Sequence, residues 1–507
     1  MRSNRHVNLE AQAAVDISVF THWNMMLSQR RHPCLLSDLP TEVLSIILCN
    51  FCRHCREPAA VPRVYFPSRQ QESDQPSWYS QDLHALHSVC LVSRRLRDIA
   101  QSILYHEFVP GYGDSWRSMR YSWGSRLTKF LRTVSLRREL AAMVQGLYLS
   151  HLLTEPVFKP SRSVTASLEE AARNRGIDLD EFLQPFRDSR PKYLHEQYQP
   201  SMDEIITMLL LCLPNLIRLH LASCTPQNPI PPPALSGLSV HGLCLRTIDI
   251  CGQGSTTISL RDRLGCILES SRATLETFHL DSYDSFKSHK LGFSNLTCPS
   301  LRNISVTVSA MCGPDLETLL SCSTSLETFI YDAISTRYCI PPPTIHDCLK
   351  LHRTSLKMLR LDLRAAQLVD EAFLPHPIPT LQAFSVLRHV SLNMLFVYSG
   401  VDRQLEDQGI LCHILPSSIV SLHLYDTLGA PMTTRLSKAL NRLMSAASGG
   451  QFTNLRNVLC YIRDPLDDHE LGTKFSGAGI KLDLIFGPPL DVVPRRRRST
   501  SSAYSSE

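Results

Sequence analysis

The densest group of side chains that could bind a metal lies between positions 49 and 55. Cys49, Cys52, His54 and Cys55 occur within seven residues, and Cys34 precedes them. The spacing of Cys52 and Cys55 is that of one half of a zinc site, but a structural zinc needs a second pair of ligands. No second C-x-x-C and no H-x-x-x-H follows nearby. We therefore expect incidental thiols here and no metal.

Motifs for covalent or phosphate chemistry are missing from the chain. It has no G-x-S-x-G elbow, no P-loop and no G-x-G-x-x-G after a strand, and its 20 histidines are scattered. We expect no catalytic residue and no cofactor. This counts against a hydrolase on an α/β scaffold, one of three hypotheses that the chain allows.

Composition excludes further classes of function. The 507 residues are 43% hydrophobic and 20% charged, which is ordinary for a folded protein of several domains. The net charge is 52 − 47 = +5, and four of these charges are the run Arg495–Arg498. A dedicated nucleic-acid binder carries a stronger basic excess, so we expect no nucleic acid as a partner. No apolar run reaches the ~18 residues of a membrane span, so we expect no membrane partner.

The cysteines point to a reducing compartment. There are 17, an odd number, and the first residues lack the apolar core of an export signal. We expect reduced thiols that pack as small hydrophobes, no disulfide framework, and a cytoplasmic or nuclear location.

Three short helices are predicted in the first hundred residues. In the first, Val43 and Ile47 share one face, while Leu44 and Leu48 form a neighbouring seam. A surface helix of a small domain needs only one apolar stripe, so two stripes predict two burial surfaces. One lies inside the module, and the other faces a partner or the rest of the chain.

The other two helices follow a long loop over residues 52–80. A second helix is expected over residues 81–91, and Ser93 is placed to cap a third. Arg94, Arg95 and Arg97 are expected to point to water or to contact an acidic partner.

The two halves of this region, LSDLPTEVLSIIL and LHALHSVCLVSRRLRDIAQSILYHEF, resemble an F-box as found in fungal F-box proteins. The resemblance covers residues 34–108 after an N-terminal extension, 1–33, and the loop over 52–80 is longer than is usual in the family. The residues that carry it are Leu39, Pro40, Glu42, Val43, Leu44, Ile47, Leu86, Val89, Cys90, Leu91, Val92, Ser93, Arg94, Leu96, Ala100, Leu104 and Tyr105.

A repeated pattern, L-x-x-L-x-L with apolar substitutes, follows from about residue 140. From Leu216 onward its starts fall 25 to 36 positions apart, and seven of ten starts follow Ser, Thr or Asn. The ten copies begin at Val144, Leu216, Leu245, Leu275, Leu301, Leu326, Leu356, Leu387, Ile419 and Leu455.

One strand and one helix per copy is the unit of a leucine-rich repeat or a diverged relative of it. We therefore predict an α/β fold: a three-helix F-box, then an irregular leucine-rich-repeat-like solenoid over 140–490 with parallel strands and outer helices. An insertion at about 153–203 carries a helix-like segment at Ala166–Leu183. Residues 491–507 are expected to form a disordered basic and serine-rich tail, with Arg495–Arg498 a nuclear-import patch, a phosphorylation site or simply solvated.

The resemblance implies a non-catalytic subunit of a Skp–cullin–F-box ubiquitin ligase. Its helical module docks on a Skp-type adaptor, and through it on a cullin, while the repeats bind an unknown protein substrate. The expected adaptor contacts are Leu39, Pro40, Val43, Leu44, Ile47, Val92, Ser93 and Leu96. The expected substrate contacts, which lie between the strand leucines, are Arg218, His220, Thr277, His279, Lys357, Arg360 and Asp362.

One alternative stays open beside the ligase subunit. The chain could be a leucine-rich-repeat scaffold for protein–protein interaction without ubiquitin transfer, its N-terminal helices only capping the solenoid. Leu44 and Leu48 would then pack on the repeat array.

Overall fold

The structure, a computed structural model, describes most of the chain in separate stretches. These are residues 38–56, 78–110, 126–149, 153, 162–188, 202–223, 243–252, 267–281, 296–333, 339–363, 377–398, 407–425, 430–462, 466 and 470–486. The N-terminal extension 1–33, most of the loop 52–80 and the tail 491–507 with Arg495–Arg498 lie outside them. Within these stretches, no helix is both long and apolar enough to cross a membrane.

The chain divides into two compact units. Unit 1 comprises the described residues 38–56 and 78–106, and unit 2 begins at residue 107. No disulfide joins any two cysteines of the described residues, and several thiols are buried.

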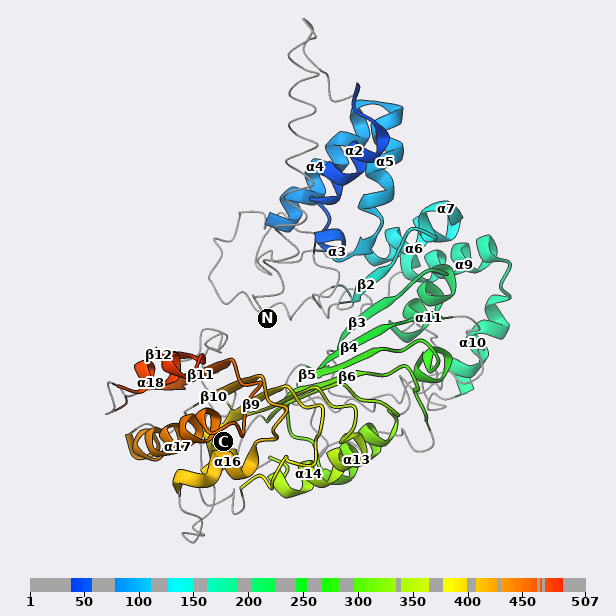
Figure 1. Cartoon of the computed structure of the whole chain (residues 1–507). Helices are drawn as coiled ribbons and strands as arrows, with labels where there is room; N and C mark the ends of the chain where they lie inside the picture. The colour runs from blue at the N-terminus through cyan, green and yellow to red at the C-terminus, as the bar shows by residue number, and fades with distance from the viewer. Residues whose placement is uncertain are drawn as a thin grey trace, which may run out of the picture. The chain divides into compact units, whose positions relative to one another are not determined.

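Unit 1 consists of helices that pack on one another (Figure 1). They are α2 (Thr41–Cys49), α3 (Arg53–Arg56), α4 (Trp78–Val92) and α5 (Arg94–Leu104). The side chain of Ser93 accepts a hydrogen bond from the Leu96 amide at 3.2 Å, so the predicted cap of the third helix is confirmed. The predicted loop over 52–80 is wrong at both ends, because α3 lies within it and α4 begins at Trp78.

Unit 2 is an α/β structure built on one sheet of twelve parallel strands. The strands follow one another in space in the order of the sequence, from β1 to β12 (Figure 1). This order is compatible with a solenoid, in which each unit adds one strand to the last. The strands are β1 (Glu107–Phe108), β2 (Gly146–Leu149), β3 (Arg218–Ser223), β4 (Thr247–Gly252), β5 (Thr277–Asp281), β6 (Asn303–Ser309), β7 (Thr328–Ala333), β8 (Met358–Asp362), β9 (His389–Asn393), β10 (Ser421–Tyr425), β11 (Asn457–Ile462) and β12 (Lys481–Phe486).

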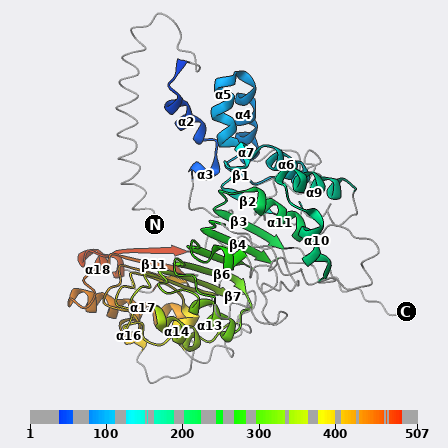
Figure 2. The ribbon, with the colours of Figure 1, turned by 90° about the vertical axis from the view of Figure 1, so that its right-hand side faces the viewer.

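Among the described residues, helices lie between many but not all successive strands of unit 2. In both views α13, α14, α16 and α17 lie on the same side of the sheet (Figures 1 and 2). The helices are α6 (Arg126–Leu136), α7 (Arg138–Ala141), α9 (Arg162–Arg175), α10 (Leu179–Asp188), α11 (Met202–Cys212), α13 (Gly313–Ser321), α14 (Pro342–Leu349), α15 (Met394–Tyr398), α16 (Ile410–Ile414), α17 (Ala430–Ser448) and α18 (Leu471–Gly477), with short 3-10 turns η6 (Lys350–His352) and η8 (Asp407–Gly409).

The repeated apolar positions form the core of unit 2. All three apolar positions of every motif copy are buried, with the exception of the half-buried Leu221. The second and third positions of each copy fall on consecutive strands and stand in register with those of the next copy. The predicted strand pattern is therefore confirmed from β2 to β11.

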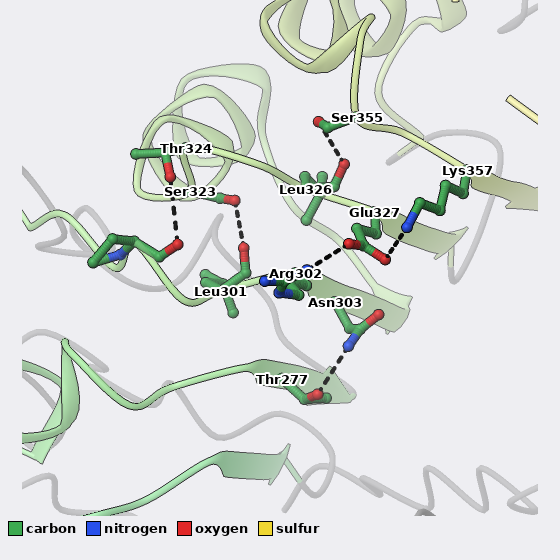
Figure 3. A network of polar contacts seen from close by, with 11 residues as sticks. Thr277, Leu301, Arg302, Asn303, Ser323, Thr324, Leu326, Glu327, Ser355 and Lys357 are labelled. Carbon is green, nitrogen blue, oxygen red and sulfur yellow. Dashed lines mark hydrogen bonds and ion pairs between the residues drawn. The ribbon is translucent and has the colours of Figure 1, made fainter. Parts of the chain in front are cut away.

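The hydroxyl residues before the motif link neighbouring copies. Three of them donate to the backbone carbonyl of the first apolar residue in the preceding copy: Thr274 to Leu245 at 2.9 Å, Ser355 to Leu326 at 2.9 Å, and Ser418 to Leu387 at 2.8 Å. Ser300 donates instead to the Ala273 carbonyl at 2.7 Å. Figure 3 shows one of these bonds beside the equivalent bond from Ser323 to Leu301. The preference for Ser or Thr directly before the motif thus reflects a side-chain hydrogen bond to the preceding copy as well as the formation of a turn.

Three helices pack together at the β2–β3 end of the sheet, where the insertion was predicted. These are α6, α9 and α11 (Figure 2). Arg175, the last residue of α9, donates to the Val134 carbonyl at 2.9 Å and to the Cys212 carbonyl at 2.7 Å. The single helix predicted over Ala166–Leu183 is wrong, because Gly176 has φ +69° and ends α9 before α10 begins.

The last strand has no counterpart in the predicted repeats. In β12, Leu482 and Leu484 occupy the second and third motif positions. Gly479 stands where the first apolar residue is expected, and Ile480 is buried one position later. Because of this shift by one position, the motif did not identify the strand.

Candidate functional site

Unit 1 contains its own apolar core. Its members come from all four helices or their ends: Leu44, Leu48, Cys52, Leu86, Leu96, Ile99, Ala100 and Ile103. The interpretation that Leu44 and Leu48 pack on the repeat array is therefore wrong, because both side chains lie inside unit 1. The helices of unit 1 therefore pack against one another through this core.

Outside this core, apolar side chains are left at the surface of unit 1. Ile46 and Ile47 on α2 are 65% and 38% exposed, and Leu91 and Val92 at the end of α4 are 75% and 71% exposed. Pro40 is exposed as well, while Leu39 and Val43 are half-buried. We name Pro40, Val43, Ile46, Ile47, Leu91 and Val92 the apolar patch.

A polar bond holds the two parts of the apolar patch together. Arg95, in the first turn of α5, donates through Nη2 to the Leu39 carbonyl at 2.6 Å, with the Thr41 hydroxyl 3.4 Å away. The end of α4, with Val92 three residues before Arg95, is thereby fixed near the start of α2. The exposed Arg94 and Arg97 add positive charge beside the patch.

The structure corrects two of the expected adaptor contacts. Leu44 is fully buried and Leu96 is 3% exposed, so neither offers a surface to a partner. Ser93 caps α5 and is exposed, so it stays among the expected contacts. Ile46 and Leu91 are exposed apolar residues that the expected set of contacts did not include. A helical wheel gives the signal for Ile46, because Ile46 and Val43 are three residues apart and share a face.

The predicted substrate residues lie on the strands of unit 2, or directly before β8 in the case of Lys357, but they do not all reach the surface. Strand pairing places Arg218 and Thr277 in one row across the sheet, with Thr247 between them, and places His220 and His279 in the next row. Lys357 is exposed, whereas Arg218, Thr277, His279 and Arg360 are half-buried. His220 is 4% exposed and Asp362 is fully buried, so the expectation that these two contact a substrate directly is wrong.

His220 belongs to a buried polar cluster. Its Nδ1 lies 2.7 Å from Oδ2 of Asp249, and the ring of Tyr148 stacks on the imidazole at 4.1 Å between centroids. An Asp–His pair is the arrangement that orients a general base. No hydrogen-bond partner lies at the buried Nε2 of His220 within the described part of the chain. The pair is therefore part of the packing of β2, β3 and β4.

Asp362, the last residue of β8, has a fully buried carboxyl group. Burial raises the pKa of Asp362 to about 6, against the opposing effects of the Arg360 guanidinium and of the Leu363 amide. The distances are 3.2 Å from Arg360 Nη2 to Asp362 Oδ2 and 2.8 Å from the Leu363 nitrogen to Asp362 Oδ1. These contacts fix the end of β8.

Sequence reasoning missed a row of charged residues at the position after the first motif leucine. Glu327 accepts from Arg302 at 2.7 Å and from Lys357 at 2.8 Å (Figure 3), and Arg246 lies 3.7 Å from Glu276. The hydrogen bond from Lys357, followed by the one from Arg302, holds the pKa of Glu327 below its usual range. At this motif position positive and negative side chains alternate from copy to copy, and this alternation was the signal in the sequence. The predicted substrate residue Lys357 belongs to the row.

Two of the thiols near residue 52 lie close to two histidine rings. The side chains of Cys52, His54, Cys55 and His106 place one ligand atom each within 4.8 Å of one another, all in unit 1. The sequence identified the first three, but His106 lies 51 residues beyond Cys55. Its position after the end of α5 gave no sign of this proximity.

Comparisons with known proteins assign no family to this arrangement. No protein-family model matches the chain, and no curated protein shows significant similarity to it.

Proposed function

We propose that the protein is the substrate-recognition subunit of a Skp–cullin–F-box ubiquitin ligase. Unit 1 is then an F-box, which docks on a Skp-type adaptor and through it on a cullin. Unit 2 is a leucine-rich-repeat-like solenoid that holds a protein substrate. The chain itself performs no chemistry in this role; it raises the concentration of the substrate near the ubiquitin-conjugating enzyme.

The observation that carries the proposal is the apolar patch on a helical unit with a complete core. Exposed apolar side chains are normal when they are scattered, whereas several together indicate an interaction surface. Ile46, Ile47, Leu91 and Val92 are all exposed within one small unit. Their exposed parts amount to roughly two and a half apolar side chains, which at about 2 kcal/mol each gives about 5 kcal/mol on burial.

The charges around the patch favour an acidic partner. Arg94, Arg95 and Arg97 lie in the first turn of α5 and are exposed, directly after Leu91 and Val92. Such rim charges steer a partner of opposite charge and add more to the association rate than to the affinity.

The long parallel sheet supports the substrate-binding half of the proposal. Stacked repeats create extended surfaces on which many side chains can contact one partner. Arg218, Thr277, His279 and Arg360 are partly accessible there, and Lys357 is exposed. Their mixed polarity suits a polar protein surface.

Reconstitution with purified components tests the proposal. The full chain is mixed with a recombinant Skp-type adaptor under reducing conditions, and complex formation is followed by size-exclusion chromatography with light scattering. We expect a one-to-one complex that also recruits the cullin. If no complex forms while an established F-box protein binds the same adaptor, the proposal is contradicted. The alternative, a repeat scaffold that takes no part in ubiquitin transfer, then remains.

Affinity capture with mass spectrometry then tests the role of unit 2. Wild type and the variant Arg218→Glu/Lys357→Glu should recover the same adaptor. We expect the variant to lose the substrate that wild type retains, and equal recovery of every partner by both would place the substrate site elsewhere.

A further inference from the structure

Four side chains with metal-binding atoms converge in unit 1. Cys52 directly precedes α3, His54 and Cys55 lie in α3, and His106 follows the end of α5. Each offers one sulfur or ring nitrogen, and these four atoms all lie within 4.8 Å of one another. Cys52 is buried and the other three are half-buried, so the cluster is set into the unit and does not lie on an open face.

The separations between these atoms agree with tetrahedral coordination. Sγ of Cys55 lies 3.3 Å from Nδ1 of His106 and 3.8 Å from Nδ1 of His54, and Sγ of Cys52 lies 3.9 Å from Nδ1 of His106. With Zn–S bonds of about 2.3 Å and Zn–N bonds of about 2.0 Å, a tetrahedron separates sulfur from nitrogen by about 3.5 Å. These three separations each lie within about 0.4 Å of that value, and the remaining pairs of ligand atoms lie within 4.8 Å.

We propose that Cys52, His54, Cys55 and His106 bind one Zn²⁺ ion. Two thiols and two imidazoles in a tetrahedral arrangement are the ligand set that favours zinc over hard cations such as Mg²⁺. On binding, each thiol releases its proton to solvent while both imidazoles bind as neutral rings. The two thiolate charges balance the ion, so the complete site is neutral and can be partly buried without a stranded charge.

The surroundings hold three of the four ligands in place before any metal binds. The Arg56 amide donates to the Cys52 carbonyl at 3.0 Å, which closes the turn of α3. The Arg56 guanidinium then pairs with Asp82 of α4 at 2.5 Å. This pair anchors α3, and with it His54 and Cys55, to the body of unit 1. Preorganised ligands of this kind reduce the ordering that binding requires.

The ion has a structural role in this arrangement. Four protein ligands complete the coordination shell of zinc and leave no position for water or substrate. The ion joins the segment after α2 to the end of α5, and so connects two parts of unit 1 that are separated by the long insertion between α3 and α4. Because such a site does not exist in the unfolded chain, its binding free energy adds to the stability of unit 1.

Metal analysis of the full chain tests the site. The protein is purified without added metal under reducing conditions, and its zinc, iron and copper contents are measured by mass spectrometry. We expect one zinc per chain. After removal of the metal by a chelator, Co²⁺ should restore one equivalent and give the absorption of a tetrahedral cobalt ion with thiolate-to-cobalt charge transfer.

Matched variants separate this site from adventitious binding. His106→Ala and Cys52→Ser should lose the bound zinc and the cobalt spectrum, whereas His87→Ala and Cys90→Ser, in the same unit but outside the cluster, should retain both. If a ligand variant fails to fold, the chelator experiment on wild type decides. We expect removal of zinc to lower the unfolding temperature and Zn²⁺, but not Mg²⁺, to restore it.

Three results would overturn the inference. They are wild type without zinc or cobalt binding, a His106→Ala variant with unchanged metal content and spectrum, and wild type that, as purified under reducing conditions, holds no metal and has a mass two hydrogens lower because Cys52 and Cys55 form a disulfide. None of these measurements involves the adaptor, so the zinc site and the proposed ligase function succeed or fail separately.

Discussion

Truncation of Leu91 and Val92 distinguishes a docking surface from ordinary surface residues. Both side chains stand at the end of α4 and are 75% and 71% exposed. The variant Leu91→Ala/Val92→Ala removes five side-chain carbons, each worth about 0.8 kcal/mol when fully buried. Because about three quarters of this area is available to a partner, the free energy of adaptor binding falls by about 3 kcal/mol, which raises the Kd by about 100-fold.

The same truncation should leave the fold intact. Only the minor, already buried part of the two side chains contributes to folding, and alanine is a better helix former than valine. We expect the free energy of unfolding to change by at most about 0.5 kcal/mol, as is usual for exposed positions. Leu44→Ala is the matched contrast. Leu44 is fully buried in unit 1, so its truncation should lower the free energy of unfolding by about 2–5 kcal/mol.

Two measurements on the full chain decide the outcome. Isothermal titration with a purified Skp-type adaptor gives the Kd, and urea unfolding gives stability. An unchanged Kd for the double variant would refute the assignment of the patch. A stability loss as large as that of Leu44→Ala would show instead that Leu91 and Val92 belong to the core.

Three further predictions concern unit 2 and are measured by urea unfolding. Ser355→Ala removes the bond to the Leu326 carbonyl and should cost about 1 kcal/mol, whereas the exposed neighbour Thr354→Ala should change little; equal effects would contradict a bond between repeats. The pKa of Asp362 is raised to about 6, so the folded state holds its proton more tightly than the unfolded state, and the stability from this group is lost as pH rises from about 4 through 6. Relative to wild type, the free energy of unfolding of Asp362→Asn should therefore gain up to about 3 kcal/mol over this pH range. A difference that stays constant with pH would contradict the burial of the charge. Burial lowers the pKa of His352, whose Nε2 lies 3.1 Å from the Leu320 carbonyl, so the free energy of unfolding of wild type should fall as pH drops below about 6.5. In His352→Gln this part of the pH dependence should be absent. Parallel pH profiles of the two proteins would exclude a neutral buried ring.

The zinc cluster shows how proximity escapes a reading along the chain. Cys52, His54 and Cys55 are near neighbours in sequence, so their spacing could be recognised directly. His106 joins them only because α5 runs back beside the segment after α2, a consequence of how the helices pack in unit 1. A search for a second pair of ligands nearby in sequence could not find a single histidine 51 residues away.

The helix α2 shows a second kind of limit. The sequence predicted an apolar surface around most of this helix and therefore two burial surfaces. Which face goes inside depends on the position of α5, which covers Leu44 and Leu48 and leaves Ile46 and Ile47 exposed. Hydrophobicity alone did not separate the core residues from the candidate contacts.

The sequence by itself determined the repeated strands of unit 2 and the cap of α5. Both depend on local spacing: apolar residues that alternate along a strand, and a hydroxyl one position before a helix. Tertiary structure alone decided that His220 and Asp362 are buried, that Thr274, Ser355 and Ser418 bond to the preceding repeat, and that His106 meets the two cysteines. The physical reason is that burial and side-chain partners depend on what packs from elsewhere in the chain, whereas periodicity reports only the direction in which each side chain points.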